Sequence, residues 1–135
     1  MRRRLLVIAA AVGAAVLVNL ILYGIGRAAG GTFHFTSPSG PAIVDGVTVA
    51  AFSALPLLIG LVAVAVLARL GDWVVRTALV VGPLLAVATI ALMTLPADFD
   101  TVSTLTLALC HLTLVPVIIV AIRAKDGLRV GQLVH

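Results

Sequence analysis

The chain has 135 residues, of which 62% are hydrophobic and 10% are charged, and its mean hydropathy is +1.28. This composition excludes a soluble globular domain, and the length suits a single membrane domain of about four spans. The net charge of +4 does not indicate a nucleic-acid-binding protein, because the basic residues lie at the ends of apolar segments and form no patch with aromatic residues.

The first apolar segment extends from about residue 5 to residue 24 and follows a run of three arginines at residues 2–4. It is longer than the about 7–15 apolar residues of a signal peptide, so we interpret it as the first transmembrane helix. Asn19 is its one strongly polar residue. Ala9 and Gly13 have the spacing of small residues that allows a second helix to pack closely.

The next segment, residues 26–46, is rich in Gly, Ser, Thr and Pro and is predicted to be a long loop. Residues 32–36 alternate polar and apolar side chains, residues 37–40 (Ser-Pro-Ser-Gly) offer a turn, and an apolar stretch follows. This pattern allows a short β-hairpin that lies over the membrane face.

Three further apolar segments follow, at about residues 47–68, 73–94 and 101–122. Asp45 is placed to cap the first of these helices, and Gly71-Asp72 predicts a C-terminal glycine followed directly by the next N-cap. A second face of small residues consists of Ala78, Gly82 and Ala86. We therefore predict an all-α membrane protein, with one domain over residues 1–135 that contains four transmembrane helices in an up-down bundle.

The basic residues are distributed unevenly over the two sides of this predicted bundle. Arg27 lies on the side of the long loop, whereas the other eight of the nine basic residues lie on the opposite side. Those eight are Arg2, Arg3, Arg4, Arg69, Arg76, Arg123, Lys125 and Arg129. Because cytoplasmic loops are enriched in Lys and Arg, we predict a multi-pass protein of the cytoplasmic membrane, with both termini in the cytoplasm and the long loop outside.

His111 lies near the middle of the fourth predicted helix. A titratable side chain at this depth costs free energy and often marks a functional site, and burial there favours the neutral imidazole. Three interpretations are open. His111 is a structural residue hydrogen-bonded to a neighbouring helix, for example through Asn19, or it binds a ligand or handles protons, or it binds a metal or haem.

Polar side chains of the predicted helices gather in the half that we expect to face outside, whereas the other half is apolar apart from Thr77 and Thr113. We infer an outward-facing polar vestibule that ends at His111. Its candidate ligand-binding residues are His111, Thr104, Asp100, Asn19, Thr106 and Ser53. The alternative is that the hydroxyl groups bond to carbonyls of their own helices and that Asp100 only caps the fourth helix.

No motif indicates an enzyme. Walker, HExxH, GxSxG and CxxC sequences are missing, Cys110 is the single cysteine, and the predicted spans hold no second histidine for a haem. We therefore expect neither catalytic residues nor a cofactor or metal. An enzyme or cofactor carrier that uses His111 as an axial ligand across a homodimer is the third and most distant hypothesis.

The chain resembles a family of small four-span membrane proteins from high-GC Gram-positive bacteria, known as a domain of unknown function. The resemblance covers nearly the whole chain and lies in VNLILYGIGRAAGGTF (residues 18–33), PLLIG (56–60) with LAR (67–69), and DTVSTLTLALCHL (100–112). It implies the four-span fold and no particular activity. The predominance of arginine among the basic residues, with much Ala, Val, Leu and Gly, is also typical of high-GC bacterial genomes.

These observations lead to two functional hypotheses. The first is a non-enzymatic accessory or interaction subunit, embedded in the lipid bilayer, whose small-residue faces pack against a second copy or another membrane protein. The alternative is a binding protein or transporter for a small molecule or ion, which would reach His111 from outside. A transporter needs polar groups in both halves of the bundle, and the apolar inner half favours the first hypothesis or a site closed at its inner end.

Overall fold

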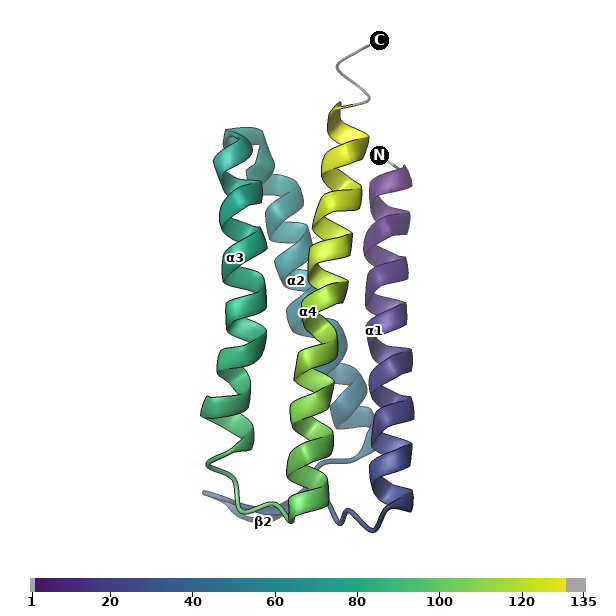
Figure 1. The fold of residues 1–135 in the computed structure, drawn as a ribbon, viewed down its shortest axis with the longest axis vertical. Helices are drawn as coiled ribbons and strands as arrows, with labels where there is room; N and C mark the ends of the chain where they lie inside the picture. Colours follow the sequence, from purple (N-terminus) through teal and green to yellow (C-terminus); the bar gives the residue numbers. More distant parts are fainter. Residues whose placement is uncertain (1, 131–135) are drawn as a thin grey trace.

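The computed structural model describes residues 2–130, which form four long helices and a small two-stranded sheet (Figure 1). The helices are α1 (Arg2–Ala28), α2 (Gly46–Leu67), α3 (Asp72–Thr89) and α4 (Thr101–Val130). A 3-10 turn, η1 (Ala68–Leu70), extends α2, and a π-helix, η2 (Ile90–Thr94), extends α3. The strands β1 (His34–Ser37) and β2 (Gly40–Ile43) pair antiparallel, so the hairpin that the loop pattern allows is present.

All four helices are long and apolar enough to cross a membrane. Large apolar side chains cover the outside of the bundle, including Leu17, Ile59 and Leu84, which are 61%, 67% and 61% exposed. Water would disfavour such a surface, whereas hydrocarbon solvates it. The prediction of an all-α, four-helix, multi-pass membrane protein is confirmed.

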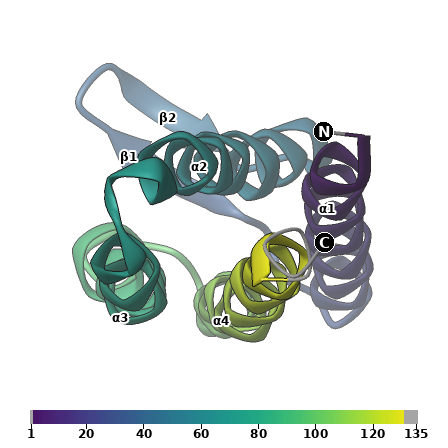
Figure 2. The same cartoon turned by 90° about the horizontal axis from the view of Figure 1, so that it is seen from above.

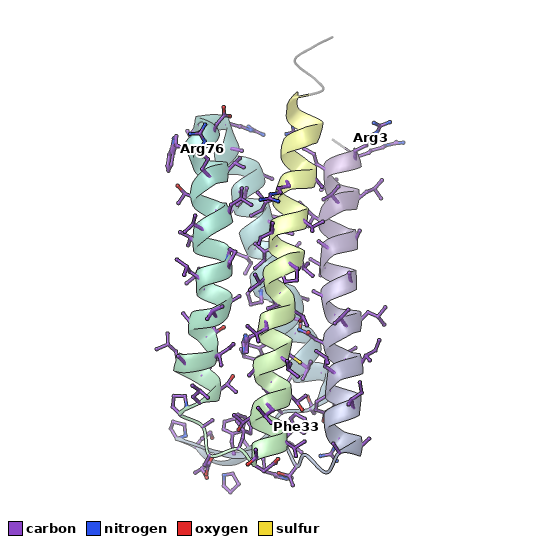
Figure 3. The ribbon with its side chains drawn as sticks, in the orientation of Figure 1. Arg3, Phe33 and Arg76 are labelled. Carbon is purple, nitrogen blue, oxygen red and sulfur yellow. The ribbon has the colours of Figure 1, made fainter. Side chains whose placement is uncertain are left out.

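The bundle has two distinct ends. The start of α1, the α2–α3 turn and the last described turns of α4 lie at one end, which we call the terminal end. The sheet and the α3–α4 turn lie at the other, which we call the hairpin end. Arg3 and Arg76 are at the terminal end, and Phe33 is at the hairpin end (Figure 3).

Helix α4 is the central element of the bundle. It packs against α1 on one side and α3 on the other, while α2 packs mainly against α1 (Figure 2). Helices α2 and α3 contact each other little, although they are consecutive in the chain. In the half toward the terminal end the helices enclose an apolar core made of Ile8, Ala15, Leu57, Leu61, Val75, Ala121 and Ile122.

The two small-residue faces predicted from the sequence differ in use. A Cβ atom at Gly82 would lie 2.9 Å from Cγ2 of Ile118, so the face on α3 brings that helix close to α4. On α1, by contrast, a Cβ atom at Gly13 would meet no described atom within 4 Å, and Ala9 is exposed. The face on α1 therefore points away from the bundle.

One of the two predicted N-caps is confirmed and the other is wrong. Oδ1 of Asp45 accepts hydrogen bonds from the N–H and the hydroxyl of Thr48, both at 2.7 Å, and caps α2. The residue that precedes α3 is Gly71, with a φ of 140°, and Asp72 is the first residue of the helix. The turn needs the positive φ that glycine adopts without strain, and Asp72 keeps its negative charge near the helix N-terminus.

We expect Gly82→Val to destabilise the protein, because the added side chain would overlap Ile118 and force α3 away from α4. Overpacking of this kind costs about 1–3 kcal/mol and would lower the thermal unfolding midpoint in detergent. Gly60→Val is the matched control, since a Cβ atom at Gly60 would meet no described atom within 4 Å. Equal losses of stability in the two variants would contradict the close approach of α3 and α4.

Candidate functional site

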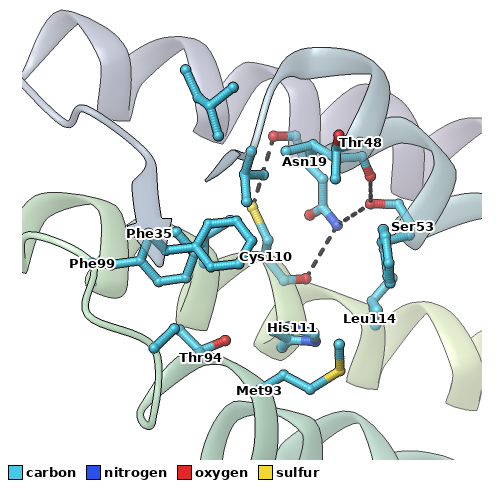
Figure 4. Close-up of a pocket in the computed structure, with 16 residues that line it drawn as sticks. Asn19, Phe35, Thr48, Ser53, Met93, Thr94, Phe99, Cys110, His111 and Leu114 are labelled. Atoms are coloured by element: carbon cyan, nitrogen blue, oxygen red, sulfur yellow. Dashed lines mark hydrogen bonds between the residues drawn. The ribbon is translucent and has the colours of Figure 1, made fainter. Parts of the chain in front are cut away.

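A cavity of about 240 Å³ lies between the helices in the half toward the hairpin end (Figure 4). Residues of α1, α2, η2 and α4 form its walls, and Phe35, Ile43 and Val44 of the hairpin region line it as well. Most of the lining side chains are apolar, so the pocket differs from the polar vestibule that the sequence predicts. Its polar side chains are Asn19, Thr48, Ser53, Thr94 and His111.

Asn19 ties three helices together beside the pocket. Its Nδ2 donates to Oγ of Ser53 at 2.8 Å and to the carbonyl of Cys110 at 3.2 Å, and its Oδ1 accepts from Thr113 at 2.6 Å. These bonds use both amide hydrogens and the amide oxygen, and only 1% of the side chain is exposed. Asn19 is therefore a structural link between α1, α2 and α4.

His111 links α4 to α3, and its partner is Thr89 where the sequence suggested Asn19. Nδ1 of His111 lies 3.0 Å from Oγ1 of Thr89, and the same hydroxyl donates to the carbonyl of Ala86 at 2.7 Å. A hydroxyl has one hydrogen, so we assign the proton of the neutral ring to Nδ1, which donates to Thr89. The other ring nitrogen, Nε2, is then a hydrogen-bond acceptor.

The structure separates the six candidate residues into two groups. His111, Asn19 and Ser53 line the pocket, whereas Thr104, Thr106 and Asp100 do not. Thr106 donates to the carbonyl of Val102, and Ser53 donates to that of Val49, each at 2.7 Å. These two hydroxyl groups follow the alternative interpretation, in which they bond to their own helices.

Sequence reasoning missed several pocket residues, among them Phe35, Phe52, Met93, Thr94 and Phe99. The rings of Phe35 and Phe99 pack with centroids 5.0 Å apart, which joins the hairpin to the α3–α4 turn above the pocket. The sequence feature that could have identified Phe35 and Phe99 is the presence of an aromatic residue in a segment predicted to be a loop. Met93 and Thr94 lie in a π-helix, so their side chains lie on a different face of the helix from the one that α-helical spacing predicts.

Two aspartates fix the loop and hairpin over this end of the bundle. Asp100 caps α4 by accepting from the N–H of Ser103 at 2.9 Å, and it also accepts from the N–H of Thr32 at 2.9 Å and its hydroxyl at 2.7 Å. Asp98 accepts from the N–H of Thr36 at 2.6 Å and from its hydroxyl at 2.7 Å. Asp100 is thus more than the simple cap of the alternative interpretation, but it holds the loop and does not line the pocket.

These hydrogen bonds favour the ionised form of both carboxyl groups. The side chain and N–H of Ser103, followed by those of Thr32, hold the pKa of Asp100 well below its ordinary value of 3.8. The N–H and side chain of Thr36 lower the pKa of Asp98 from the same value.

Phe33 is wedged between the end of α1 and the start of α4. It is fully buried, has a φ of 58°, and packs against Tyr23 with ring centroids 4.7 Å apart. Its N–H donates to the hydroxyl of Ser103 at 2.9 Å. A Cβ atom at Gly26 or at Gly31 would come within 2.9 Å of the Phe33 ring, so both glycines make room for it. A positive φ at an aromatic residue is strained, and the surrounding contacts maintain it.

A family model described as "Family of unknown function (DUF6069)" matches residues 1–127. No curated protein and no solved structure matches the chain. The pocket and the contacts around it are therefore the basis on which a function can be argued.

We expect the two aspartate anchors to weaken in acid. Because both pKa values are lower in the folded protein than in the unfolded chain, their stabilisation is complete above the ordinary value of 3.8 and is lost as the pH falls through the folded-state values. Hydrogen-exchange protection of the Thr36 and Thr32 amides should therefore fall as the pH is lowered below 3.8. Asp98→Asn should abolish the pH dependence at Thr36 alone, and protection of both amides that does not change in acid would contradict the assignment.

Proposed function

This chain belongs to DUF6069, a family of unknown function, and we propose that it is a non-enzymatic membrane protein that binds a small lipid-soluble molecule in the pocket described above. The observation that carries the proposal is the position of the pocket mouth. The most exposed lining residues are Ile43, Phe52 and Met93, at 46%, 59% and 53%. All three are apolar, and they come from the hairpin, α2 and η2.

This distribution supports a mouth at the side of the bundle, between α2 and η2. Helices α2 and α3 contact each other little, so the described helices leave that side open. Toward the hairpin end the pocket is lined by Phe35, Val44 and Phe99, and the aspartate anchors hold this cover in place. A ligand therefore arrives from the hydrocarbon of the bilayer.

The inner part of the bundle supports binding over transport. Beyond the pocket, the core toward the terminal end consists of packed apolar residues, among them Leu57, Leu61 and Ile122. A polar or charged molecule finds no hydrogen-bond partner among these apolar side chains, and closely packed protein interiors offer no path for it. The pocket is closed at its inner end.

We further propose that the protein lies in the cytoplasmic membrane of a bacterium with the hairpin end outside. Arginine is concentrated at the terminal end, where the described residues include Arg3, Arg69, Arg76 and Arg123, and Arg27 lies at the hairpin end. The positive-inside rule then places the pocket in the outer leaflet. The side chains of Lys125 and Arg129, which support the same orientation, lie outside the described residues.

A photoreactive alkylbenzene with a diazirine group tests this binding in lipid nanodiscs. We expect light-induced labelling at the pocket, around Phe52 and Met93, that an excess of unlabelled alkylbenzene displaces. Met93→Trp should reduce this labelling several-fold by narrowing the mouth. Leu92→Trp is the matched control, because Leu92 is 75% exposed, adjacent in sequence, and outside the pocket lining. Labelling that is spread over all lipid-facing residues and cannot be displaced would refute the proposal.

The exposed face of α1 supports a second function, the accessory or interaction subunit suggested by the sequence. Ala9 is exposed, and Gly13 has open space where a Cβ atom would stand, so the backbone of α1 is accessible to another helix in the membrane. A second copy of this chain or another membrane protein would pack there. This role uses a different surface from the pocket and is compatible with ligand binding.

We expect Gly13→Leu to weaken self-association by roughly tenfold, because a larger side chain prevents close helix approach. Energy transfer between labelled copies in liposomes would measure the association. Gly60→Leu is the control, since it alters an equally open glycine on α2. A wild-type protein that remains monomeric at high density, or equal losses in both variants, would contradict this second function.

A further inference from the structure

We propose that the ligand carries a hydroxyl group on an apolar body, as a lipid-soluble phenol does, and that Nε2 of His111 accepts the hydrogen bond of that hydroxyl. This inference rests on the proposed function of the pocket as a ligand site. It assigns His111 the ligand-binding role that was one of its three interpretations, and adds Thr94 as a second polar contact.

The first support comes from the unused nitrogen of His111. Nδ1 is occupied by Thr89, and Nε2 has no hydrogen-bond partner among the described residues. Among the described residues, no completely buried side-chain nitrogen or oxygen lacks a hydrogen-bond partner. Nε2 is therefore not completely buried. His111 lines the pocket, and Figure 4 shows it between Thr94 and Leu114, so we place Nε2 at the pocket. A neutral imidazole acceptor in a membrane interior recognises a group that donates a hydrogen.

The second support comes from Thr94, which is 3% exposed and lines the same pocket. Its hydroxyl has no hydrogen-bond partner among the described residues, so it is not completely buried, and we place it at the cavity that Thr94 lines. Figure 4 shows its oxygen on the side of Thr94 that faces His111. A hydroxyl that faces a mostly apolar cavity has an unused hydrogen-bonding capacity, which a polar group on the ligand would satisfy. Thr94 can donate to the oxygen of a ligand hydroxyl while His111 accepts its hydrogen.

The size and remaining lining of the pocket indicate the apolar body. A dry cavity of about 150 Å³ lined by apolar side chains is large enough to bind benzene, so the cavity of about 240 Å³ accommodates one substituted ring. Phe35, Phe52 and Phe99 provide aromatic contacts for such a ring. A chain attached to the ring leaves through the mouth beside Met93 into the bilayer. A complete two-chain lipid does not fit.

A trio of matched probes tests the hydroxyl directly. 4-Octylphenol, 4-octylanisole and octylbenzene share the ring and the chain, and only the phenol can donate a hydrogen bond. Each is used to displace the photoreactive alkylbenzene from the full-length protein in nanodiscs, at matched concentrations in the membrane. We expect the phenol to displace the photoreactive probe at about tenfold lower concentration than the other two compounds, because one additional hydrogen bond in a buried site raises affinity by about that factor.

The outcomes separate this inference from the proposed function. Equal displacement by all three probes would confirm a ligand pocket and overturn the hydroxyl inference. No displacement by any of them would overturn both. As a spectroscopic check, His111 labelled with nitrogen-15 in a His34→Gln, His135→Gln background should show an unprotonated Nε2 that shifts saturably with the phenol alone. A protonated Nε2 in the ligand-free protein would also overturn the inference.

Variants distinguish recognition by His111 from a merely structural role. His111→Asn retains an amide near the position of Nδ1, which can still bond to Thr89, but removes the Nε2 acceptor. It should bring the tenfold preference for the phenol close to unity while octylbenzene still binds. Thr94→Val, which keeps the side-chain shape, should weaken the phenol several-fold, and Thr77→Val, outside the pocket on α3, should have no effect. A preference for the phenol that survives His111→Asn would overturn the assignment.

Discussion

The need to pair polar groups inside a hydrocarbon solvent, met most completely at Asn19, determines how this bundle is assembled. One buried side chain bonds to Ser53 on α2 and to Cys110 and Thr113 on α4. Leaving any of these groups unpaired in lipid would cost several kcal/mol, so α1, α2 and α4 are fixed relative to one another. Helix α3 is outside this network. It is held by the apolar core that includes Val75, by the close approach to α4 at Gly82 and by the bond between Thr89 and His111. Because the last two of these contacts join α3 to α4 rather than to α2, α2 and α3 contact each other little, and the pocket lies between α2 and η2.

The hairpin end is stabilised by a different chemistry, because it lies at the polar boundary of the bundle. Asp98 and Asp100 each accept paired N–H and hydroxyl bonds from one threonine, Thr36 in β1 and Thr32 in the preceding loop, so the α3–α4 turn is joined to the loop and to the hairpin. The buried ring of Phe33 adds an apolar contact between α1 and α4. This cover leaves the side of the bundle, where the exposed lining residues Ile43, Phe52 and Met93 are apolar, as the entrance of the ligand route proposed above.

Much of the fold could be predicted because its signals are local. Apolar length defines a membrane helix, Asp45 precedes Thr48 at the capping distance, and the alternating loop contains its own turn. The site was harder, because helical spacing shows which residues share a face but not which neighbour that face meets. His111 was therefore paired with Asn19 when its partner is Thr89, and Thr104 and Thr106 were placed in a vestibule that they do not line. The positive φ of Phe33 has no local signal, since the contacts that maintain it are distant in sequence.

The π-helix η2 has a consequence for how this pocket changes during evolution. The N–H of Leu95 bonds to the carbonyl of Ile90, five residues earlier, so the turn holds one more residue than α-helical bonding would require. Losing that residue through a single-codon deletion would restore the α-helix and rotate the side chains on one side of the deletion by about 100° relative to the bundle. Met93 and Thr94 would then be exchanged for neighbours as lining residues while the packing of α1, α2 and α4 stayed intact. A change in length at this one turn would thus alter the lining of the pocket, and with it the proposed ligand preference, without loss of the fold.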